Sequence, residues 1–349
     1  MTKGKRIGMK NKLILFPGLF AMCLTACARA DYEPKDYILT LKREYNEVHI
    51  LQLTDTHIGD KDNAQLHYDF MDLTINDAKA KASADGGKLD LIVVTGDVFT
   101  FASKHTAKEF FTWIDGHGVP WTLTFGNHDE QCFFSIDWLT EVLNKYGKNC
   151  LFLDKQDDKV QGNSNFAINL MNADNSIFEQ LIIMDSNRYN YTGYFGYDYF
   201  HEDQIAWYDR LIDYTKDQNG GATVPSLMFY HIPLPEVRDA WAAAEADPSL
   251  ILNPADEAQQ NEEPCNPDYN SHFYDVIKVK GSTHGMYFGH DHINNYILNY
   301  DGIHFGYGIK ATDRVYADDS LLGGRVIIVH NDHSLTYQDF YHTYAEVNK

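Results

Sequence analysis

Short apolar runs alternate with longer amphipathic segments along the first two thirds of the chain. The runs are rich in β-branched and aromatic residues, as buried strands are. The segments between them carry apolar residues at helical spacing, and several end at glycines. We therefore predict strands over 48–53, 91–95, 121–125, 165–171, 180–184 and 227–230, and helices over 66–84, 105–118, 136–147 and 201–218.

From residue 286 onward the pattern changes to strands in quick succession. We predict these strands over 286–288, 295–300, 304–309, 325–330 and 334–340. Asp301-Gly302 joins two of them, and an Asp-Gly pair between apolar strands favours a tight hairpin. Early strand–helix–strand units followed by late hairpins predict an α/β fold, either one mixed sheet with helices outside or two stacked sheets.

The N-terminus has the layout of an export signal. A basic leader precedes the apolar run 13–24, which is shorter than a membrane span and closes in a Leu-Thr-Ala-Cys motif ending at Cys27. This motif resembles a bacterial lipobox, so we predict a lipoprotein signal peptide over 1–26, lipidation of Cys27 and a polar tether over 27–45. Ordinary cleavage after Ala30 is the alternative. Either pathway exports the protein to the cell envelope, and lipidation would anchor it to a membrane at the periplasmic or cell surface.

The acidic composition excludes one class of partner. The 349 residues include 50 acidic and 29 basic side chains, a formal net charge of −21. Such a surface repels phosphate backbones, so we expect no nucleic-acid binding. The hydrophobic content of 44% supports a large core, which we assign to one domain over 46–343. Within it, segment 245–270 is rich in Asp, Glu, Asn and Pro, and we predict a loop or lid insertion that tunes substrate choice.

Five of the predicted strands are each followed by Asp, His or Asn. Ligands of open α/β sheets bind at the carboxyl ends of strands, so these side chains are expected to meet in one crevice. Carboxylate, imidazole and amide groups suit manganese, iron or zinc, and two adjacent cations can clamp a phosphoryl group and generate hydroxide. The candidate residues are Asp55, His57, Asp97, Asn127, His128, Asp129, His231, His290 and His292.

The spacing within these motifs supports metal coordination. Residues i and i+2 of an extended chain point to the same face, so Asp55 can converge with His57, and His290 with His292. Glycine precedes three of the motifs, where it allows a tight turn and a close backbone approach. Each motif alone has an ordinary explanation as a turn or a surface loop. Their occurrence together, each at a strand end, favours a metal site.

Taken in order, these motifs resemble the full motif series of the calcineurin-like metallophosphoesterases, over about residues 48–292. The resemblance implies a four-layer α/β/β/α sandwich with mixed sheets and a dinuclear metal centre. In that family pattern Asp97 bridges the two ions. One ion is then held by Asp55, His57 and His292, and the other by Asn127, His231 and His290.

The same resemblance implies the chemistry. His128 faces the substrate as proton donor, and Asp129 helps to orient it. The predicted function is hydrolysis of a small phosphate ester by attack of a metal-bound hydroxide. The alternatives are a phosphodiesterase acting on cyclic nucleotides or lipid head groups, and a non-catalytic surface binding protein that retains the fold.

Within the family, the chain is similar to purple-acid-phosphatase-like proteins, on residues 230–236 and on the Gly-Tyr-Asp stretch 196–198. It departs from true purple acid phosphatases at two positions. They carry glycine where this chain has His57, and a tyrosine ligand where it has Thr100. We therefore expect no ferric–tyrosinate chromophore, which leaves manganese, iron and zinc as candidate metals.

Two further features of the sequence could contribute to substrate binding. Lys310 and Arg314 follow a strand and either hold a substrate phosphate or are solvated surface charges, and we expect the latter. The aromatic stretch 189–200 either lines a substrate rim or packs in the core, and we expect packing.

Overall fold

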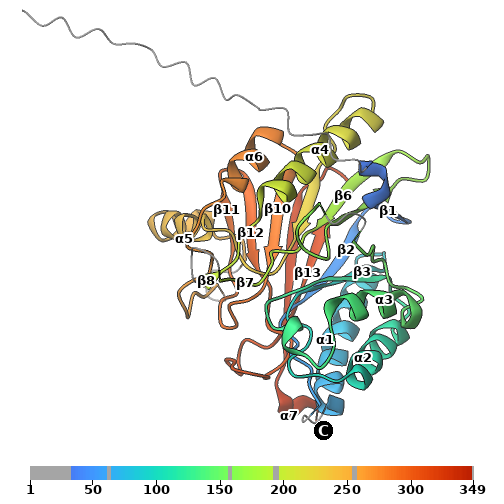
Figure 1. Ribbon diagram of the computed structural model, residues 1–349, viewed down its shortest axis with the longest axis vertical. Helices are drawn as coiled ribbons and strands as arrows, with labels where there is room; N and C mark the ends of the chain where they lie inside the picture. The colour runs from blue at the N-terminus through green and yellow to red at the C-terminus, as the bar shows by residue number, and fades with distance from the viewer. Residues whose placement is uncertain (1–32, 61–63, 156–158, 192–195, 254–257, 348–349) are drawn as a thin grey trace, which may run out of the picture. The chain divides into compact units, whose positions relative to one another are not determined.

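Two stacked β-sheets flanked by helices form the fold in the computed structural model (Figure 1). The structure describes residues 33–60, 64–155, 159–191, 196–253 and 258–347. The predicted signal peptide and Cys27 therefore lie outside the described residues. None of the helices in the described part of the chain combines the length and apolar content that crossing a bilayer requires.

The smaller sheet holds the first strands of the predicted domain. Its strands are β2 (Val48–Leu53), β3 (Leu89–Thr95), β4 (Trp121–Thr124), β13 (Gly323–Val329) and β14 (Leu335–Tyr341). They lie in the order β14-β13-β2-β3-β4, with β2, β3 and β4 parallel and β13 antiparallel to both of its neighbours. The ends of β2, β3 and β4 therefore lie at the same edge of the sheet.

The larger sheet is also mixed. Its strands are β1 (Ile38–Lys42), β5 (Phe166–Met171), β6 (Ile177–Ile183), β9 (Ser226–Phe229), β10 (Thr283–Phe288), β11 (Ile297–Tyr300) and β12 (Ile303–Tyr307). They lie in the order β1-β5-β6-β9-β10-β12-β11. β11 and β12 pair antiparallel around Asp301 and Gly302, whose φ angles of 53° and 84° are those of a type I′ turn. The predicted hairpin is confirmed.

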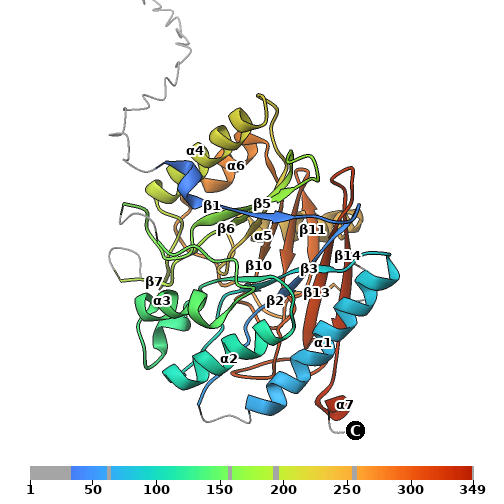
Figure 2. The ribbon, with the colours of Figure 1, turned by 90° about the vertical axis from the view of Figure 1, so that its right-hand side faces the viewer.

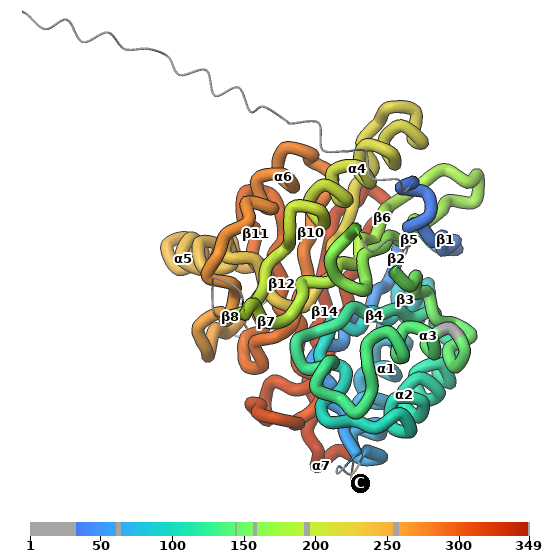
Figure 3. The backbone as a smooth tube through the Cα atoms, viewed as in Figure 1, coloured from blue at the N-terminus to red at the C-terminus, as the bar shows by residue number. Residues whose placement is uncertain are grey.

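Helices cover the outer face of each sheet (Figure 2). The helices are α1 (Ala64–Ala84), α2 (Lys104–Gly116), α3 (Ile136–Tyr146), α4 (Glu202–Gln218), α5 (Val237–Ala246), α6 (Phe273–Lys280) and α7 (Tyr344–Val347). The first three pack on the smaller sheet, α4 and α6 pack on the larger one, and α5 lies beside β11 (Figure 3). The shorter elements are the 3₁₀ turns Pro34–Tyr37, Asp129–Gln131 and Pro248–Leu250, and the ribbon of β7 (Tyr189–Asn190) and β8 (Gly196–Tyr197).

Side-chain alternation along the central strands explains the layers. In β9, Leu227 and Phe229 join a core shared with the smaller sheet, whereas Met228 lies in a core shared with α4 and α6. Each sheet is thus covered on both faces, as its long apolar runs require. The predicted α/β/β/α sandwich with mixed sheets is confirmed.

The predicted domain limits are wrong at both ends. The proposed tether over 27–45 contains β1, which pairs in parallel with β5, and the buried Tyr37. An edge strand is only half covered and carries charged residues, which is why its sequence reads as a polar tether. After residue 343, α7 packs on α1 through Tyr344 and Phe70. Helices α5 and α6 were also not predicted.

A buried arginine joins the two sheets. Arg325 of β13 donates to both carboxylate oxygens of Asp339 at 2.6 and 2.7 Å. It also donates to the carbonyl of Asn295 at 2.7 Å and to that of Tyr307 in the other sheet. The pair is enclosed and well bonded, so both charges are compensated.

We expect Arg325→Met to destabilise the protein by about 3–5 kcal/mol, because it leaves the Asp339 carboxylate buried and unpaired. Urea denaturation of the two proteins measures the difference. The double variant Arg325→Met/Asp339→Leu removes both charges and should lose less stability than the single variant. Equal stability of Arg325→Met and the parent would show that the pair is dispensable.

Candidate metal centre

Strand ends from both sheets carry the predicted ligands. Asp55, Asp97 and Asn127 follow β2, β3 and β4 of the smaller sheet, while His231 and His290 follow β9 and β10 of the larger one. The structure brings six of the seven predicted ligands into two neighbouring groups of buried side chains that share Asp97, and the seventh, Asn127, is also buried. The strand ends that the sequence pattern indicated therefore meet in space, and the assignment of these residues as ligands stays a prediction.

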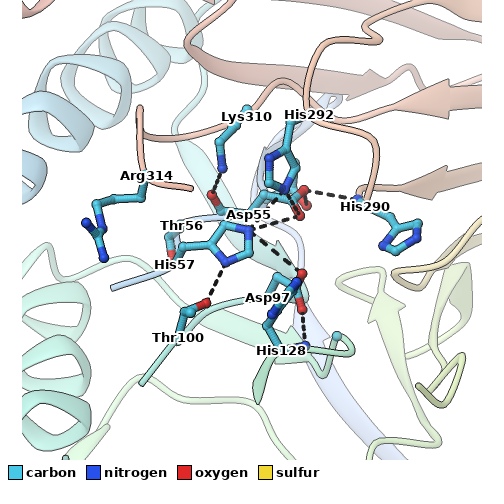
Figure 4. Close-up of polar contacts among 12 residues, drawn as sticks. Asp55, Thr56, His57, Asp97, Thr100, His128, His290, His292, Lys310 and Arg314 are labelled. Carbon is cyan, nitrogen blue, oxygen red and sulfur yellow. Dashed lines mark hydrogen bonds and ion pairs between the residues drawn. The ribbon is translucent and has the colours of Figure 1, made fainter. Parts of the chain in front are cut away.

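The first group consists of Asp55, His57, Asp97 and His292, whose ligand atoms all lie within 4.8 Å of one another. Figure 4 shows these side chains pointing toward one another. His292 Nε2 lies 3.4 Å from Asp55 Oδ1, and His57 Nε2 lies 3.8 Å from Asp97 Oδ2. Two carboxylates and two imidazoles are a ligand set suited to manganese, iron or zinc.

The second group shares Asp97 with the first. It adds His231 and His290 within the same 4.8 Å limit, and His231 Nε2 lies 3.3 Å from Asp97 Oδ2. Asn127 lies beside this group, and its Nδ2 donates to the Tyr189 hydroxyl at 3.0 Å. That bond leaves the Asn127 amide oxygen as the atom available to a cation.

Several buried atoms of the centre lack a hydrogen-bond partner among the described residues. They are Asp55 Oδ1, Asn127 Oδ1, His231 Nε2 and His290 Nε2. A buried polar atom without a partner costs free energy, so four such atoms in one place indicate that something binds them. All four are lone-pair donors, which fits metal cations.

Hydrogen bonds on the far side of each ring orient the imidazoles. His231 Nδ1 donates to the carbonyl of Thr95 at 2.8 Å, and His292 Nδ1 donates to that of Tyr316 at 2.9 Å. A carbonyl only accepts, so in the neutral form of each ring Nε2 presents a lone pair. His57 Nδ1 contacts the hydroxyl of Thr100 at 2.7 Å. The Nε2 atoms of His57 and His292 then face each other at 3.0 Å, a separation that a shared cation favours.

The backbone of the centre is strained. Asp55, His57, Asp97 and His290 have φ angles of 52°, 47°, 49° and 80°, in the left-handed region that side chains other than glycine seldom adopt. A Cβ atom at Gly126 would collide with the Asp97 carboxylate. Such strain concentrates at functional sites, where surrounding contacts hold it in place.

Burial sets the protonation of the ligands. It lowers the pKa of His57 well below its usual value and that of His290 to about 3, so both rings are neutral. Burial alone would raise the pKa of Asp97, but the charge of His231 and the hydrogen bond from it hold that pKa well below its usual value. Burial would lower the pKa of His231, but the Asp97 carboxylate raises it to about 10, so this ring would lose a proton on binding a cation. Neutral imidazoles and ionised carboxylates are the forms that bind metals.

The role predicted for Asp129 is wrong. Its carboxylate accepts from the backbone N–H groups of Phe99 at 2.9 Å and of Gly126 at 2.8 Å, so it holds the loop and does not touch the His128 ring. The ring instead bonds through Nδ1 to Gln131 Oε1 at 2.7 Å. No sequence pattern pointed to Gln131, because the contact depends on the 3₁₀ turn Asp129–Gln131.

The surface role predicted for Lys310 is also wrong. Lys310 is 1% exposed, and its Nζ donates to the carbonyl of Asp55 at 2.9 Å (Figure 4). Thr312 Oγ1 donates to the next carbonyl, that of Thr56, also at 2.9 Å. Lys310 and Thr312 thus support the strained segment that presents Asp55 and His57.

The predicted lid segment is tied to the ligand loop between His290 and His292. The backbone N–H of Cys265 donates to Asp291 at 3.1 Å, and Glu262 Oε1 accepts from the N–H of Ile293 at 3.0 Å. Residues 254–257 lie outside the described residues. A role in substrate choice stays a prediction, but the described part of 245–270 also helps to hold a ligand loop.

A polar cavity of about 280 Å³ lies beside the Gly126 loop. Its lining includes Lys155, Asp185 and Tyr189, together with the ion pair of Arg188 and Glu130. Tyr189 belongs to both this cavity and the hydrogen bond with Asn127. The aromatic stretch 189–200 therefore contributes at least one residue to the site.

A family model described as calcineurin-like phosphoesterase matches residues 48–294. The chain belongs to this family. "Probable inactive purple acid phosphatase 29" of Arabidopsis thaliana is 25% identical to this calcineurin-like phosphoesterase over 322 residues, 84% of this chain and 78% of the relative. "Phosphatase DCR2" of Saccharomyces cerevisiae is 26% identical over 271 residues, 72% of this chain and 45% of the relative. These relatives confirm the resemblance to purple-acid-phosphatase-like members of the family.

Among solved structures, a dimetal phosphatase from Danio rerio is similar to this calcineurin-like phosphoesterase with a TM-score of 0.49 and 13% identity. The match covers 81% of this chain and 95% of that one.

Proposed function

We propose that the chain is a dinuclear-metal phosphoesterase that hydrolyses phosphate esters. The observation that carries this proposal is the pair of ligand groups that share Asp97. Each group is buried and includes an imidazole whose Nδ1 is hydrogen-bonded to a backbone carbonyl, so that its Nε2 is oriented toward the other ligands. Two cations bound there supply positive charge for the phosphoryl oxygens and activate water as the nucleophile.

The protein's own residues then divide the remaining work. Asp97 lies between the groups, and its Oδ1 accepts from the backbone N–H of His128 at 2.7 Å, which fixes the loop beside the ligands. The His128 ring lies edge-on to that of His57, with their centroids 5.2 Å apart. Its Nδ1–H donates a hydrogen bond to Gln131 Oε1, so in the imidazolium form the Nε2–H is the group that can give a proton to the departing alkoxide oxygen, which leaves the ring neutral.

A panel of metals and substrates tests the proposal. Metal-free protein is titrated with manganese, zinc, iron or magnesium, and hydrolysis of phosphate monoesters and diesters is followed at each step. Activity that rises until two equivalents are bound supports a dinuclear phosphoesterase, and the preferred ester separates a phosphatase from a phosphodiesterase. Full activity with a single bound equivalent would reject the dinuclear mechanism.

A non-catalytic binding protein is the second candidate. The Arabidopsis thaliana relative bears the name "Probable inactive purple acid phosphatase 29", which favours this alternative. Against it stands the presence of all seven candidate ligands together with His128, since a protein that only binds has no need of a proton donor. Two bound cations with no hydrolysis of any ester in the panel would favour the non-catalytic candidate.

We also propose export as a lipoprotein, on the sequence motif alone. A lipid on Cys27 would anchor the folded domain to a membrane surface. Mass spectrometry of the mature protein from its native host should find an N-terminal Cys27 carrying acyl chains. A mature N-terminus at Asp31 would instead establish cleavage after Ala30 without lipid.

A further inference from the structure

Exposed apolar side chains gather on the loops that carry or contact the ligands. Among the described residues, the large exposed hydrophobic side chains are Tyr45, Phe101, Phe133, Tyr191, Tyr269, Val279, Val315 and Tyr316. Four of them flank the first ligand group, and we call these the apolar rim: Phe101, Phe133, Val315 and Tyr316. Single exposed apolar residues are ordinary on protein surfaces, but a group placed around a binding site calls for an explanation.

One side of the rim adjoins His57. Thr100 contacts His57 Nδ1 at 2.7 Å, and Phe101 is the next residue, 61% exposed. The backbone N–H of Phe133 donates to the carbonyl of Ala102 at 2.9 Å, which brings the loop of Phe133 against that of Phe101. Phe133 is 70% exposed.

The other side of the rim adjoins His292. The ring of Tyr316 stacks on that of His292 with centroids 4.1 Å apart, and it is 44% exposed. Its hydroxyl donates to Glu262 at 2.9 Å, so this ring is held in place. Val315, directly before it, is 55% exposed. Because His57 and His292 face each other at 3.0 Å, the two sides of the rim border the same ligands.

Backbone strain sets two rim residues apart from ordinary surface residues. Phe101 has a φ of 52° and Val315 a φ of 72°. The left-handed region is unfavourable for bulky residues and most of all for β-branched ones. Neither side chain recovers that cost by burial, since both are exposed. Strained residues that project apolar groups beside a binding site are typical of a binding surface.

We propose that the apolar rim binds an apolar substituent, alkyl or aryl, on the alcohol of the phosphate ester. This specificity rests on the proposed function, because it assumes that the phosphoryl group lies at the ligands. The stacking of Tyr316 on His292 places apolar surface in contact with a ligand ring, so one small molecule can reach both. The substrate class is therefore a phosphate ester of an apolar alcohol.

Binding of alkylphosphonates tests the rim without requiring hydrolysis. Calorimetry on the metal-loaded protein compares ethyl-, butyl- and octylphosphonate. Full burial of a methylene gives up to about fourfold in affinity, so a half-exposed rim should give about twofold for each methylene. In Phe101→Asn/Val315→Asn this gain should largely vanish. Asparagine tolerates the left-handed backbone, so both changes should leave thermal stability equal or higher.

Val279→Asn is the matched control, because Val279 is 85% exposed on α6 and does not belong to the rim. It should keep the full gain with chain length. The proposal is overturned if affinity is independent of chain length, or if the gain survives in the Asn variant. If the protein binds lipid vesicles, loses this binding in the Asn variant, and binds all three alkylphosphonates equally, the rim is a membrane-binding surface and the proposal is overturned. If affinity rises with chain length but the corresponding alkyl phosphates are not hydrolysed, the rim binds an apolar group as proposed and the proposed phosphoesterase activity is rejected.

Discussion

Asp97→Asn is expected to lower kcat/KM for phosphate esters by at least about a thousandfold, together with the content of both metals. Asp97 is the one residue that belongs to both ligand groups of the described structure, so its charge acts on two ions at once. Several kcal/mol of transition-state stabilisation depend on those ions, and each 1.36 kcal/mol is a factor of ten in rate. Elemental analysis and initial rates on the same samples measure the two losses.

Asp90→Asn provides the control, in the strand that leads to Asp97. Asp90 is a buried carboxyl in β3, at the end of the strand opposite to Asp97, and it accepts from the N–H of His49 at 3.0 Å. Burial raises the pKa of Asp90 to about 6. The protonated carboxyl therefore stabilises the folded state below the unfolded pKa, and this stabilisation is lost as the pH rises through about 6. Asparagine carries no charge, so this variant should be at least as stable as the parent at pH 7 and keep both metals. Retention of two metals by Asp97→Asn would contradict the bridging role.

His128→Ala is expected to keep both metals while kcat falls by about 10²–10⁴-fold, the usual contribution of a general acid. His128 is half-buried beside the ligands, and its ring is held by Gln131 with no contact to the Asp129 carboxylate. The loss should be large for alkyl phosphates, whose leaving oxygen needs a proton. It should be small for nitrophenyl phosphate, which has a good leaving group.

Gln131→Ala separates orientation from proton donation. It removes the acceptor of the His128 Nδ1 proton and leaves the imidazole in place, so kcat should fall less than in His128→Ala but with the same dependence on the leaving group. Loss of a metal from His128→Ala would make His128 a ligand. Equal losses for alkyl and nitrophenyl esters would exclude the proton-donor role.

The strands and the meeting of the candidate residues were predictable from local sequence patterns, whereas the choice of two stacked sheets came from the family resemblance. Val48–Leu53 is one apolar run that ends just before Asp55, and such strand ends identify a shared edge without any knowledge of packing. The supporting residues lacked such a signal. Lys310 has the sequence context of a surface charge, and only the packing of its segment against the Asp55 loop makes it buried. β1 was missed because its apolar run, Ile38–Lys42, is only five residues long and lies between charged segments.

The ligands come from loops of two different sheets, and this has a consequence for stability. Asp97 follows a strand of the smaller sheet and His231 one of the larger, so a cation bound to both cross-links the two halves of the sandwich much as a disulfide would. At a free concentration one hundred times its Kd, such an ion adds about 2.7 kcal/mol to the free energy of unfolding. Removal of the metals by a chelator would then lower the free energy of unfolding as well as stop catalysis. The melting temperature would therefore measure how much metal is bound, even before a substrate is known.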